Sequence, residues 1–436
     1  MKWSAGAAVL GGVVVAGLMA CGAPVSAAPN GSIFPQCPGD RNGDAIPDSP
    51  NTGFGVVFWN GARVRFEGGP SLATRRYYID RNNNGVRNPA TEGIVHCMHL
   101  AGGDGFVTMA DGNPVYTFGF SDVTGLLPDQ VVNGNGTRPG GLAAATYPAP
   151  TIALTEGEEF FLSLTNVGMI MRPDLFDQHS VHFHGFPQAA SVFDGVPESS
   201  ATVNMGSTFT YYYNIVDGLA GTYMYHCHVE ATEHIQMGMV GNLYIHPRNF
   251  PKRAYTDGDA STAFDVEYPI QLGSLDRNFH DQHIAIQPLP FAAMDDKHAL
   301  LNGRGYPDTV AAGPIYTDAG FGNLPSQPMS SRITATAGQK VLLRLSNLGV
   351  TRFFTIGSTI PMRVIAQSAR LLRGPDGKNL YYKTNSLTLG GGESYDVILD
   401  TAGVAPGTYL LYTTNLNYLS NGQEDFGGMM TEITLQ

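Results

Sequence analysis

The chain is acidic and rich in turn-forming residues. Its 436 residues include 37 Asp and Glu but only 25 Lys and Arg, which gives a formal net charge of −12. Such a surface repels polyanions, so the composition argues against nucleic-acid binding. Charged residues make up only 14% of the chain, and 54 Gly with 28 Pro favour a turn-rich β protein over a helical bundle or a disordered chain. Four cysteines are too few for a disulfide scaffold.

The N-terminus has the pattern of a secretory leader. Lys2 precedes the apolar stretch 5–20, which is too short for a comfortable membrane span. A small-x-small cleavage site ending at Ala27 predicts a signal peptide over residues 1–27, whereas a lipobox ending at Cys21 predicts a lipid anchor. We therefore expect export to the periplasm or cell envelope, with lipid anchoring as the alternative to ordinary cleavage.

Residues 28–101 predict a loop-rich extension. Within it, segments 40–48 and 80–92 carry Asp and Asn oxygens at alternate positions, which is the spacing of calcium-binding loops. Turns rich in Asn and Gly have the same composition without an ion. Two hypotheses therefore remain for these segments: they bind calcium, or they are turns without a metal ion.

From residue 102 onward, short β-branched and aromatic runs alternate with turn residues, which predicts sheets packed as sandwiches. An internal repeat sets the number of domains, because a pattern in one half recurs with the same spacing in the other. We expect two β-sandwich domains, at 102–247 and 258–436. The repeated pattern is Ile152, Thr155, Gly157, Leu162, Leu164, Asn166 and Gly168, which recurs as Ile333, Thr336, Gly338, Leu343, Leu345, Asn347 and Gly349.

Histidines cluster in the first of these domains. Six of the twelve in the chain fall between His179 and His234, which points to a metal. In the segment HSVHFHG, His182 and His184 project from the same face of an extended strand and could address one metal together.

A second cluster, HCHVEATEHIQMGM from His226 to Met239, contains a thiolate, imidazoles and a thioether. One Cys, two His and a weak axial Met form the trigonal site that suits copper and one-electron transfer. Zinc instead prefers four strong ligands in a tetrahedron. His226 and His228 flank Cys227 and would point to the opposite face of the strand, so an electron could reach them through few covalent bonds.

These two segments resemble a cupredoxin domain of the multicopper oxidase family. The resemblance implies an all-β chain of two cupredoxin-like Greek-key β-sandwich domains with a loop-rich N-terminal extension. It also implies a copper oxidoreductase that takes single electrons at a type 1 copper and reduces O2 to water at a type 2/type 3 cluster. By residue match, type 1 copper would be held by His179, Cys227, His234 and Met239, type 2 copper by His182, and the type 3 pair by His184, His226 and His228.

The step from Cys227 to His234 is longer than the family's usual one, and the second domain has no matching histidines. Aligning the repeats sets His182 and His184 against Phe354 and Ile356, and His226 to His228 against 412–414. The second domain therefore resembles the family's copper-free domain.

Three hypotheses follow from this half set of cluster ligands. In the favoured one, a homo-oligomer completes the cluster, because four histidines of one chain face the same four of another. In the second, the chain is similar to copper nitrite reductases and holds a type 2 site. In the third, only type 1 copper binds, and the protein is an electron-transfer or copper-binding protein without oxidase activity. The reductant is a small molecule or metal ion in the first hypothesis.

The other candidate residues have simpler expectations. Once Cys21 belongs to leader or lipid and Cys227 to copper, Cys37 and Cys97 most simply form one disulfide. Glu230 is a candidate proton relay for O2 reduction. His280, His283 and His298 are expected to be surface histidines beside turns, because nothing near them in the sequence completes a ligand set.

Overall fold

The computed structural model describes residues 58–59, 62–66, 76–80, 84, 88, 93–133, 141–188, 190–318, 320, 322–422 and 424–436. The expected signal peptide, Cys21, Cys37, the segment 40–48 and most of 80–92 lie outside these residues, so export, lipid anchoring and calcium remain predictions. Among the described residues, no helix has the length and apolar character needed to cross a membrane.

The first domain consists of two sheets. Runs of β-branched and aromatic residues alternate with turns here, and several of the resulting strands are buried on both faces. The four-stranded sheet has the order β6-β11-β10-β8, and the seven-stranded sheet has the order β1-β2-β3-β4-β7-β9 with β5 beside β4. The strands are β1 (Phe58–Trp59), β2 (Ala62–Phe66), β3 (Arg76–Asp80), β4 (Ile94–Thr108), β5 (Pro114–Asp122), β6 (Ala149–Thr155), β7 (Glu158–Gly168), β8 (His182–His184), β9 (Thr208–Asn214), β10 (Gly221–His226) and β11 (Val240–His246).

The expected extension contributes strands to this domain. β4 runs across the expected boundary at residue 101, and β1 to β3 continue the same sheet beyond it. The physical reason is that β4 pairs in parallel with β7 over its whole first half, from Ile94 opposite Glu158 onward. The sheet therefore begins well before residue 102, within the segment for which the composition predicts loops.

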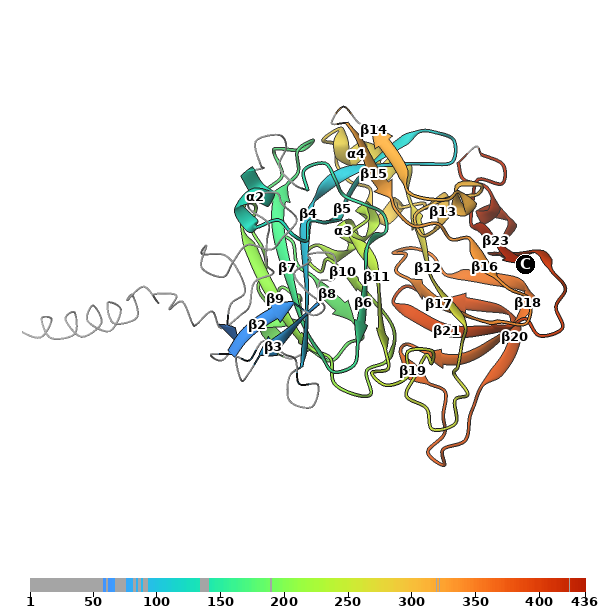
Figure 1. Ribbon diagram of the computed structural model, residues 1–436. Helices are drawn as coiled ribbons and strands as arrows, with labels where there is room; N and C mark the ends of the chain where they lie inside the picture. Colours follow the sequence, from blue (N-terminus) through green and yellow to red (C-terminus); the bar gives the residue numbers. More distant parts are fainter. Residues whose placement is uncertain are drawn as a thin grey trace, which may run out of the picture.

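The second domain is a single curled sheet with its own core, seen to the right of the first domain in Figure 1. Ten strands share it, in the order β13-β12-β17-β21-β18-β22-β23-β16 with β19 and β20 beside β18, and β14 and β15 form a separate pair. The strands are β12 (Val266–Leu275), β13 (His298–Leu301), β14 (Ile315–Asp318), β15 (Asn323–Gln327), β16 (Ile333–Ala335), β17 (Lys340–Asn347), β18 (Phe354–Gln367), β19 (Arg370–Leu371), β20 (Tyr382–Leu389), β21 (Glu393–Asp400), β22 (Gly407–Thr413) and β23 (Met430–Leu435).

The strand pairing follows the internal repeat. β7 and β17 carry the repeated leucines and asparagine, and each pairs in parallel with one neighbour and antiparallel with the other. Likewise, the last strands of the two domains, β11 and β23, pair antiparallel with β10 and β22 and in parallel with β6 and β16. The fold is all-β and cupredoxin-like in both halves, as the sequence predicts.

The two domains meet across a polar seam. The guanidinium of Arg344 on β17 is fully buried, and its Nε donates to Glu267 at 2.7 Å. Its NH1 lies 3.5 Å from Asp396 and donates to Thr222 of the first domain at 3.2 Å. Thr222 in turn donates to Asp396 at 2.5 Å. Because these charges pair with one another inside the protein, the seam fixes the two domains against each other.

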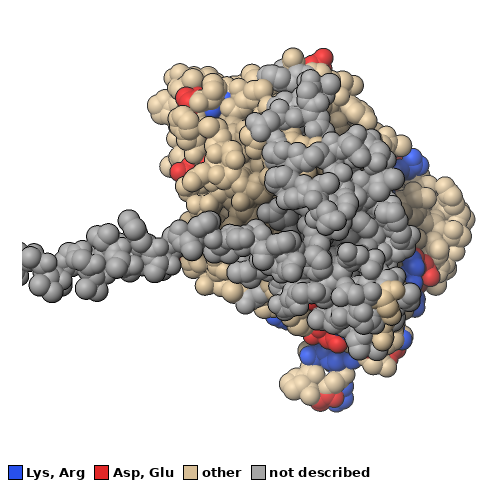
Figure 2. All heavy atoms as spheres, turned by 60° about the vertical axis from the view of Figure 1, so that its left-hand side comes forward, with Lys and Arg blue, Asp and Glu red and all other residues tan. Residues whose placement is uncertain are grey.

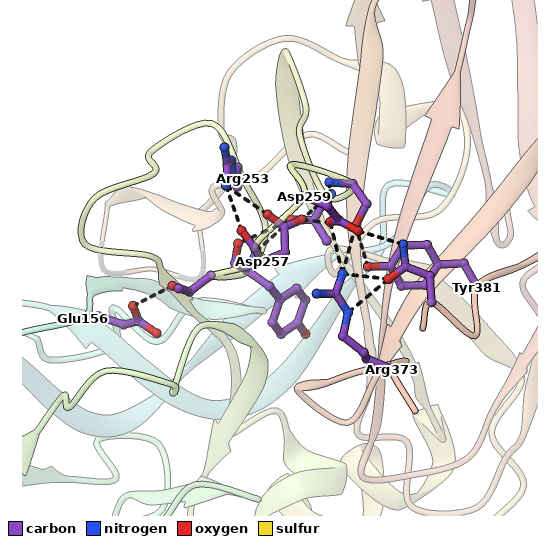
Figure 3. A network of polar contacts seen from close by, with 11 residues as sticks. Glu156, Arg253, Asp257, Asp259, Arg373 and Tyr381 are labelled. Atoms are coloured by element: carbon purple, nitrogen blue, oxygen red, sulfur yellow. Dashed lines mark hydrogen bonds and ion pairs between the residues drawn. The ribbon is translucent and has the colours of Figure 1, made fainter. Parts of the chain in front are cut away.

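The segment between the domains is also held by polar contacts, shown in Figure 3. Thr256 donates to the buried carboxylate of Glu156 at 3.2 Å, and Arg253 donates to the backbone oxygen of Asp257 at 2.8 Å. Further along, Arg373 donates to Asp259 at 3.1 Å. The link is therefore a structured connection that belongs to both domains.

The described residues also form three short α-helices, α2 (Pro128–Asn133), α3 (Ala231–Met237) and α4 (Arg277–Ile284), and four single-turn 3-10 helices. α4 belongs to the second domain in sequence but packs on β5 of the first.

Charged side chains are sparse on the described part of the face in Figure 2 and gather into no single basic field.

Candidate metal centre

Three side chains of the expected type 1 set meet in the core of the first domain. The Sγ atom of Cys227 lies 3.2 Å from Nδ1 of His234. One ligand atom from each of His179, Cys227 and His234 lies within 4.8 Å of the others, and all three side chains are fully buried. Met239 is fully buried in the same core cluster as Cys227. The structure thus brings His179 from one motif together with three residues of the other.

Local backbone structure explains the long step from Cys227 to His234. β10 ends at His226, Glu230 adopts a left-handed conformation with φ 45°, and α3 then carries His234 back over the thiol. Gly238, with φ 118°, ends the helix. The backbone N–H of Met239 donates to His234 O at 2.9 Å, and its carbonyl accepts from the Cys227 N–H at 3.1 Å. A helical turn, rather than an open loop, occupies the extra residues.

The electrostatics of this group favour a thiolate ligand. Burial alone would raise the pKa of the Cys227 thiol, but the imidazoles of His234 and His179 outweigh it and hold that pKa well below its usual value. Burial opposes the charge on His234 too, yet Cys227 and Asp177 raise its pKa to about 10. Thiolate is the form in which cysteine binds metal.

Unpartnered polar atoms indicate that this group fits a metal ion. Both ring nitrogens of His179 are buried without a hydrogen-bond partner. A buried polar atom without a partner destabilises a fold by about 1–3 kcal/mol. The backbone N–H of Ser180 donates to the Cys227 sulfur at 3.4 Å and would support the thiolate. A soft thiolate with two imidazoles and a nearby thioether is the donor set that suits copper.

The four remaining histidines of the motifs gather at the edge of the small sheet. In the antiparallel pairing of β8 with β10, His182 lies opposite His226 and Phe183 lies opposite Tyr225. Phe183 points into the core, where its ring stacks 3.9 Å from that of Tyr213. The histidines on either side of it therefore face away from the core.

The imidazoles of this edge group are close enough to share metal ions. Ligand atoms of His182, His184 and His226 lie within 4.8 Å of one another, and His184 Nδ1 lies 3.3 Å from His226 Nε2. The ring of His228 is centred 5.2 Å from that of His182. Only His226 is buried among the four, and the other three are partly exposed, so the group faces outward from the domain.

Backbone carbonyls orient two of these rings. Nδ1 of His182 lies 2.6 Å from Asp194 O, and Nδ1 of His226 lies 2.7 Å from Cys227 O. Because a carbonyl only accepts, each Nδ1 carries the proton and each Nε2 keeps a lone pair for a metal. Burial lowers the pKa of His226 to about 3 and also lowers those of His182 and His184. All three are therefore neutral at pH 7, which is the form in which imidazole can bind a metal.

The second domain places no metal ligands at the matching position. Among the described residues, every group of three potential ligands lies in the first domain. His226 lies opposite His182 in the first domain, and Tyr412, which aligns with His226, lies opposite Gly357 in the second. The strand pairing therefore matches His182 with Gly357, three residues beyond the expected Phe354. The reason is that β18 begins earlier than its counterpart and extends much farther. Phe354 and Ile356 are fully buried core residues.

A glycine loop of the second domain nevertheless touches the histidine edge. A Cβ atom at Gly392 would lie 2.8 Å from Nε2 of His184. Gly392 also has φ 87°, a conformation that other residues rarely adopt. Only glycine lets this loop approach the imidazole so closely. The second domain therefore packs against the histidine edge, although it contributes no ligand there.

The structure corrects the expectation that His280, His283 and His298 lie on the surface. All three are buried. The ring of His280 lies between the backbone oxygens of Tyr116 at 2.5 Å and Gln236 at 3.0 Å. Histidine spacing alone could not reveal that α4 packs against the first domain, because no short-range signal encodes that contact.

Asp177, a carboxylate beside His234, was not identified from the sequence. Oxygens of Asp177 and Glu233 and a nitrogen of His234 lie within 4.8 Å of one another. Asp177 Oδ2 is 3.8 Å from His234 Nε2, the nitrogen that faces away from Cys227. The one available signal was that Asp177 precedes His179 by a single intervening residue.

Two other expectations stay predictions. Glu230 is exposed, and burial with the neighbouring Glu233 raises its pKa. The charges that act on it are those around Cys227 rather than those of the histidine edge. Cys97 is buried and disulfide-bonded, but Cys37 lies outside the described residues, so their pairing is still a prediction.

Known proteins resemble this chain over both domains. A family model described as multicopper oxidase matches residues 129–249, and a second with the same description matches residues 281–436. Laccase-2 from Botryotinia fuckeliana is 29% identical over 266 residues, 60% of this chain and 39% of that protein. L-ascorbate oxidase from Cucurbita pepo var. melopepo is 23% identical over 264 residues, 58% of this chain and 43% of that protein. The chain spans less than half the length of these relatives.

Solved structures share the fold. The blue copper oxidase from Nitrosomonas europaea matches with a TM-score of 0.57 and 22% identity, over 78% of this chain and 86% of that one. The copper nitrite reductase from the same organism matches with a TM-score of 0.52 and 18% identity, over 78% of this chain and 94% of that one. At these identities the two matches show a shared fold, and the chemistry of the site has to be argued from its side chains.

Proposed function

Because this chain belongs to the multicopper oxidase family, we propose that it is a copper oxidoreductase that passes single electrons from a reducing substrate to O2. The observation that carries the proposal is the buried group of Cys227, His179 and His234 beside Met239. Bound there, copper would supply a one-electron acceptor that cycles between two oxidation states.

The chain itself provides a short path away from this group. Cys227 is covalently joined to His226 and His228, whose rings belong to the histidine edge. The Nδ1 atom of His226 also donates to the carbonyl of Cys227, which adds a hydrogen bond to the covalent path. Electrons would therefore enter on one side of β10 and leave on the other.

We place electron entry at His234 Nε2. This nitrogen has no hydrogen-bond partner among the described residues, and the partly exposed carboxylates of Asp177 and Glu233 lie beside it. A donor bound at these oxygens would be one imidazole away from the thiolate. Two carboxylates favour cationic donors or donors with N–H or O–H groups.

We further propose that a second copy of the chain completes the histidine edge. Reduction of O2 to two water molecules takes four electrons and four protons, and the resemblance implies a cluster with histidines from two domains. The second domain offers Gly392 rather than a ligand at His184. A symmetric contact that brings His182, His184, His226 and His228 of two chains together supplies both halves with one surface.

One measurement tests these steps together. We expect the copper-loaded oligomer to bind more than one copper per chain, to show intense thiolate-to-copper absorption, and to consume O2 with a phenolic or metal-ion donor. One copper per chain with the absorption but no O2 uptake would contradict the cluster and favour an electron carrier. Donor oxidation that depends on nitrite without O2 would favour the nitrite-reductase alternative.

Export is proposed on the leader alone. N-terminal sequencing and mass measurement of protein isolated from cells should find a chain beginning after Ala27, or at a lipid-modified Cys21. A mature chain that still begins at Met1 would contradict export.

A further inference from the structure

His283 of the second domain reaches the first domain next to the expected type 1 group. It lies near the end of α4 and is buried, with 2% of its side chain exposed. Its ring is centred 4.7 Å from that of Phe118, in an edge-on contact, and the Phe118 ring is centred 5.6 Å from that of His234. Phe118 thus packs against both histidines.

The hydrogen bonds of His283 fix which ring nitrogen carries its proton. NH1 of Arg172 lies 3.1 Å from His283 Nδ1, and a guanidinium can only donate. Nδ1 must therefore accept, and the proton lies on Nε2. Nε2 is 2.7 Å from Glu233 Oε1, so His283 donates to this carboxylate.

Arg172 is itself held in a fixed orientation. Its Nε and NH2 donate to the two oxygens of Asp174 at 2.8 and 2.7 Å, a two-pronged pair. NH1 also donates to the backbone oxygen of His283. The guanidinium is mostly buried, although Asp174 is exposed. Arg172 therefore donates both to Asp174 at the surface and to His283, and His283 donates in turn to Glu233.

We propose that His283 is a positioning residue for electron entry: with Arg172 it holds Glu233 beside Asp177, so that two carboxylates flank Nε2 of His234. The inference rests on the proposed function for the location of the entry point. It adds that the domain without metal ligands controls recognition of the donor. His283 touches neither the expected ligands nor the donor and acts only through Glu233.

Two variants on the same helix separate positioning from packing. His283→Leu removes the donor to Glu233, and His280→Leu removes a buried imidazole whose contacts are to backbone oxygens instead. His283→Gln restores an N–H group close to the original position. Glu233→Gln, on a partly exposed side chain, tests the same step if His283→Leu fails to fold.

The measured quantity is the rate at which a donor reduces the copper-loaded protein without O2. Stopped-flow spectroscopy records this rate as the loss of the thiolate-to-copper absorption. The donors are hexaammineruthenium(II), a cation, and hexacyanoferrate(II), an anion. We expect His283→Leu and Glu233→Gln to lower the cation-to-anion rate ratio about tenfold, with the spectrum before mixing unchanged. His280→Leu should leave the ratio unchanged, and His283→Gln should restore most of it.

Equal slowing with both donors, or the same change in His280→Leu, would overturn the proposal. The bleaching step needs no O2, so it still reports on His283 if the chain proves not to be an oxidase. A readout without copper is also available: nitrogen-15 NMR of the metal-free protein should show His283 protonated at Nε2. Protonation at Nδ1 would contradict the inference.

Discussion

The two domains share strand pairing but differ at one edge strand. In the first domain, β8 has three residues and pairs only with β10. In the second domain, β18 has 14 residues and pairs with β19, β20, β21 and β22. A short edge strand leaves its side chains free to bind metal, whereas a long central strand is covered on both sides. The difference indicates that a metal site in this repeat would require an open edge strand as well as histidines.

The first prediction concerns Cys227, whose thiolate has no counterpart in the second domain. Cys227→Ser should abolish the intense absorption of the copper-loaded protein and its oxidation of donors, because a hydroxyl is a far poorer ligand for this ion. Absorption spectra and O2 uptake check it. The matched control is Thr413→Ser at the corresponding buried position of the second domain, which should leave both unchanged. An intact absorption band in Cys227→Ser would contradict the assignment.

The second prediction separates the two metal groups within the first domain. A double change, His182→Ala with His184→Ala, should lower copper per chain and stop O2 uptake while leaving the thiolate absorption in place. These residues lie on β8, and neither is among the residues grouped with Cys227. Copper analysis and the visible spectrum measure it. Tyr412→Phe, in the second domain, serves as the control, and loss of the thiolate band would show that the two groups are one.

The third prediction concerns the polar seam around Arg344 that joins the two domains. Arg344→Leu leaves the carboxylates of Glu267 and Asp396 without their cation, and breaking a buried pair in this way destabilises by about 3–5 kcal/mol. Urea unfolding followed by tryptophan fluorescence measures the change. Lys378→Ala, which removes an exposed pair with Asp376, should change stability by less than about 1 kcal/mol. Equal effects would mean that the seam contributes no more than a surface pair.

The fourth and smallest effect concerns acid stability. Burial lowers the pKa of His99 on β4 to about 4 from 6.5, so the unfolded chain takes up this proton first as pH falls. The folded state should therefore lose about 3 kcal/mol between pH 6.5 and pH 4 from this residue. Urea unfolding at several pH values should show a shallower slope for His99→Gln. An unchanged slope would contradict the assignment.

The fold and the grouping of the expected type 1 residues were accessible from the sequence because both rest on local patterns. Their role as copper ligands stays a prediction. Period-two runs predict strands, and the repeated glycines and leucines predict two domains of one plan. His179, Cys227 and His234 follow from ligand chemistry. Contacts between domains were not accessible: nothing near His283 in sequence indicates that α4 packs on β5. The alignment of His182 with Phe354 failed because β18 begins earlier than its counterpart and extends farther, and only the strand pairing reveals that register.

β10 carries the domain seam at one end and an expected metal-ligating histidine at the other. Thr222 donates to Asp396 of the second domain, and His226 lies four residues farther along the same strand. An ion that binds only the folded chain adds its binding free energy to the stability of the whole cooperative unit. Since one strand joins both features, copper would protect the metal-free lobe against heat and proteases as well as the lobe that binds it.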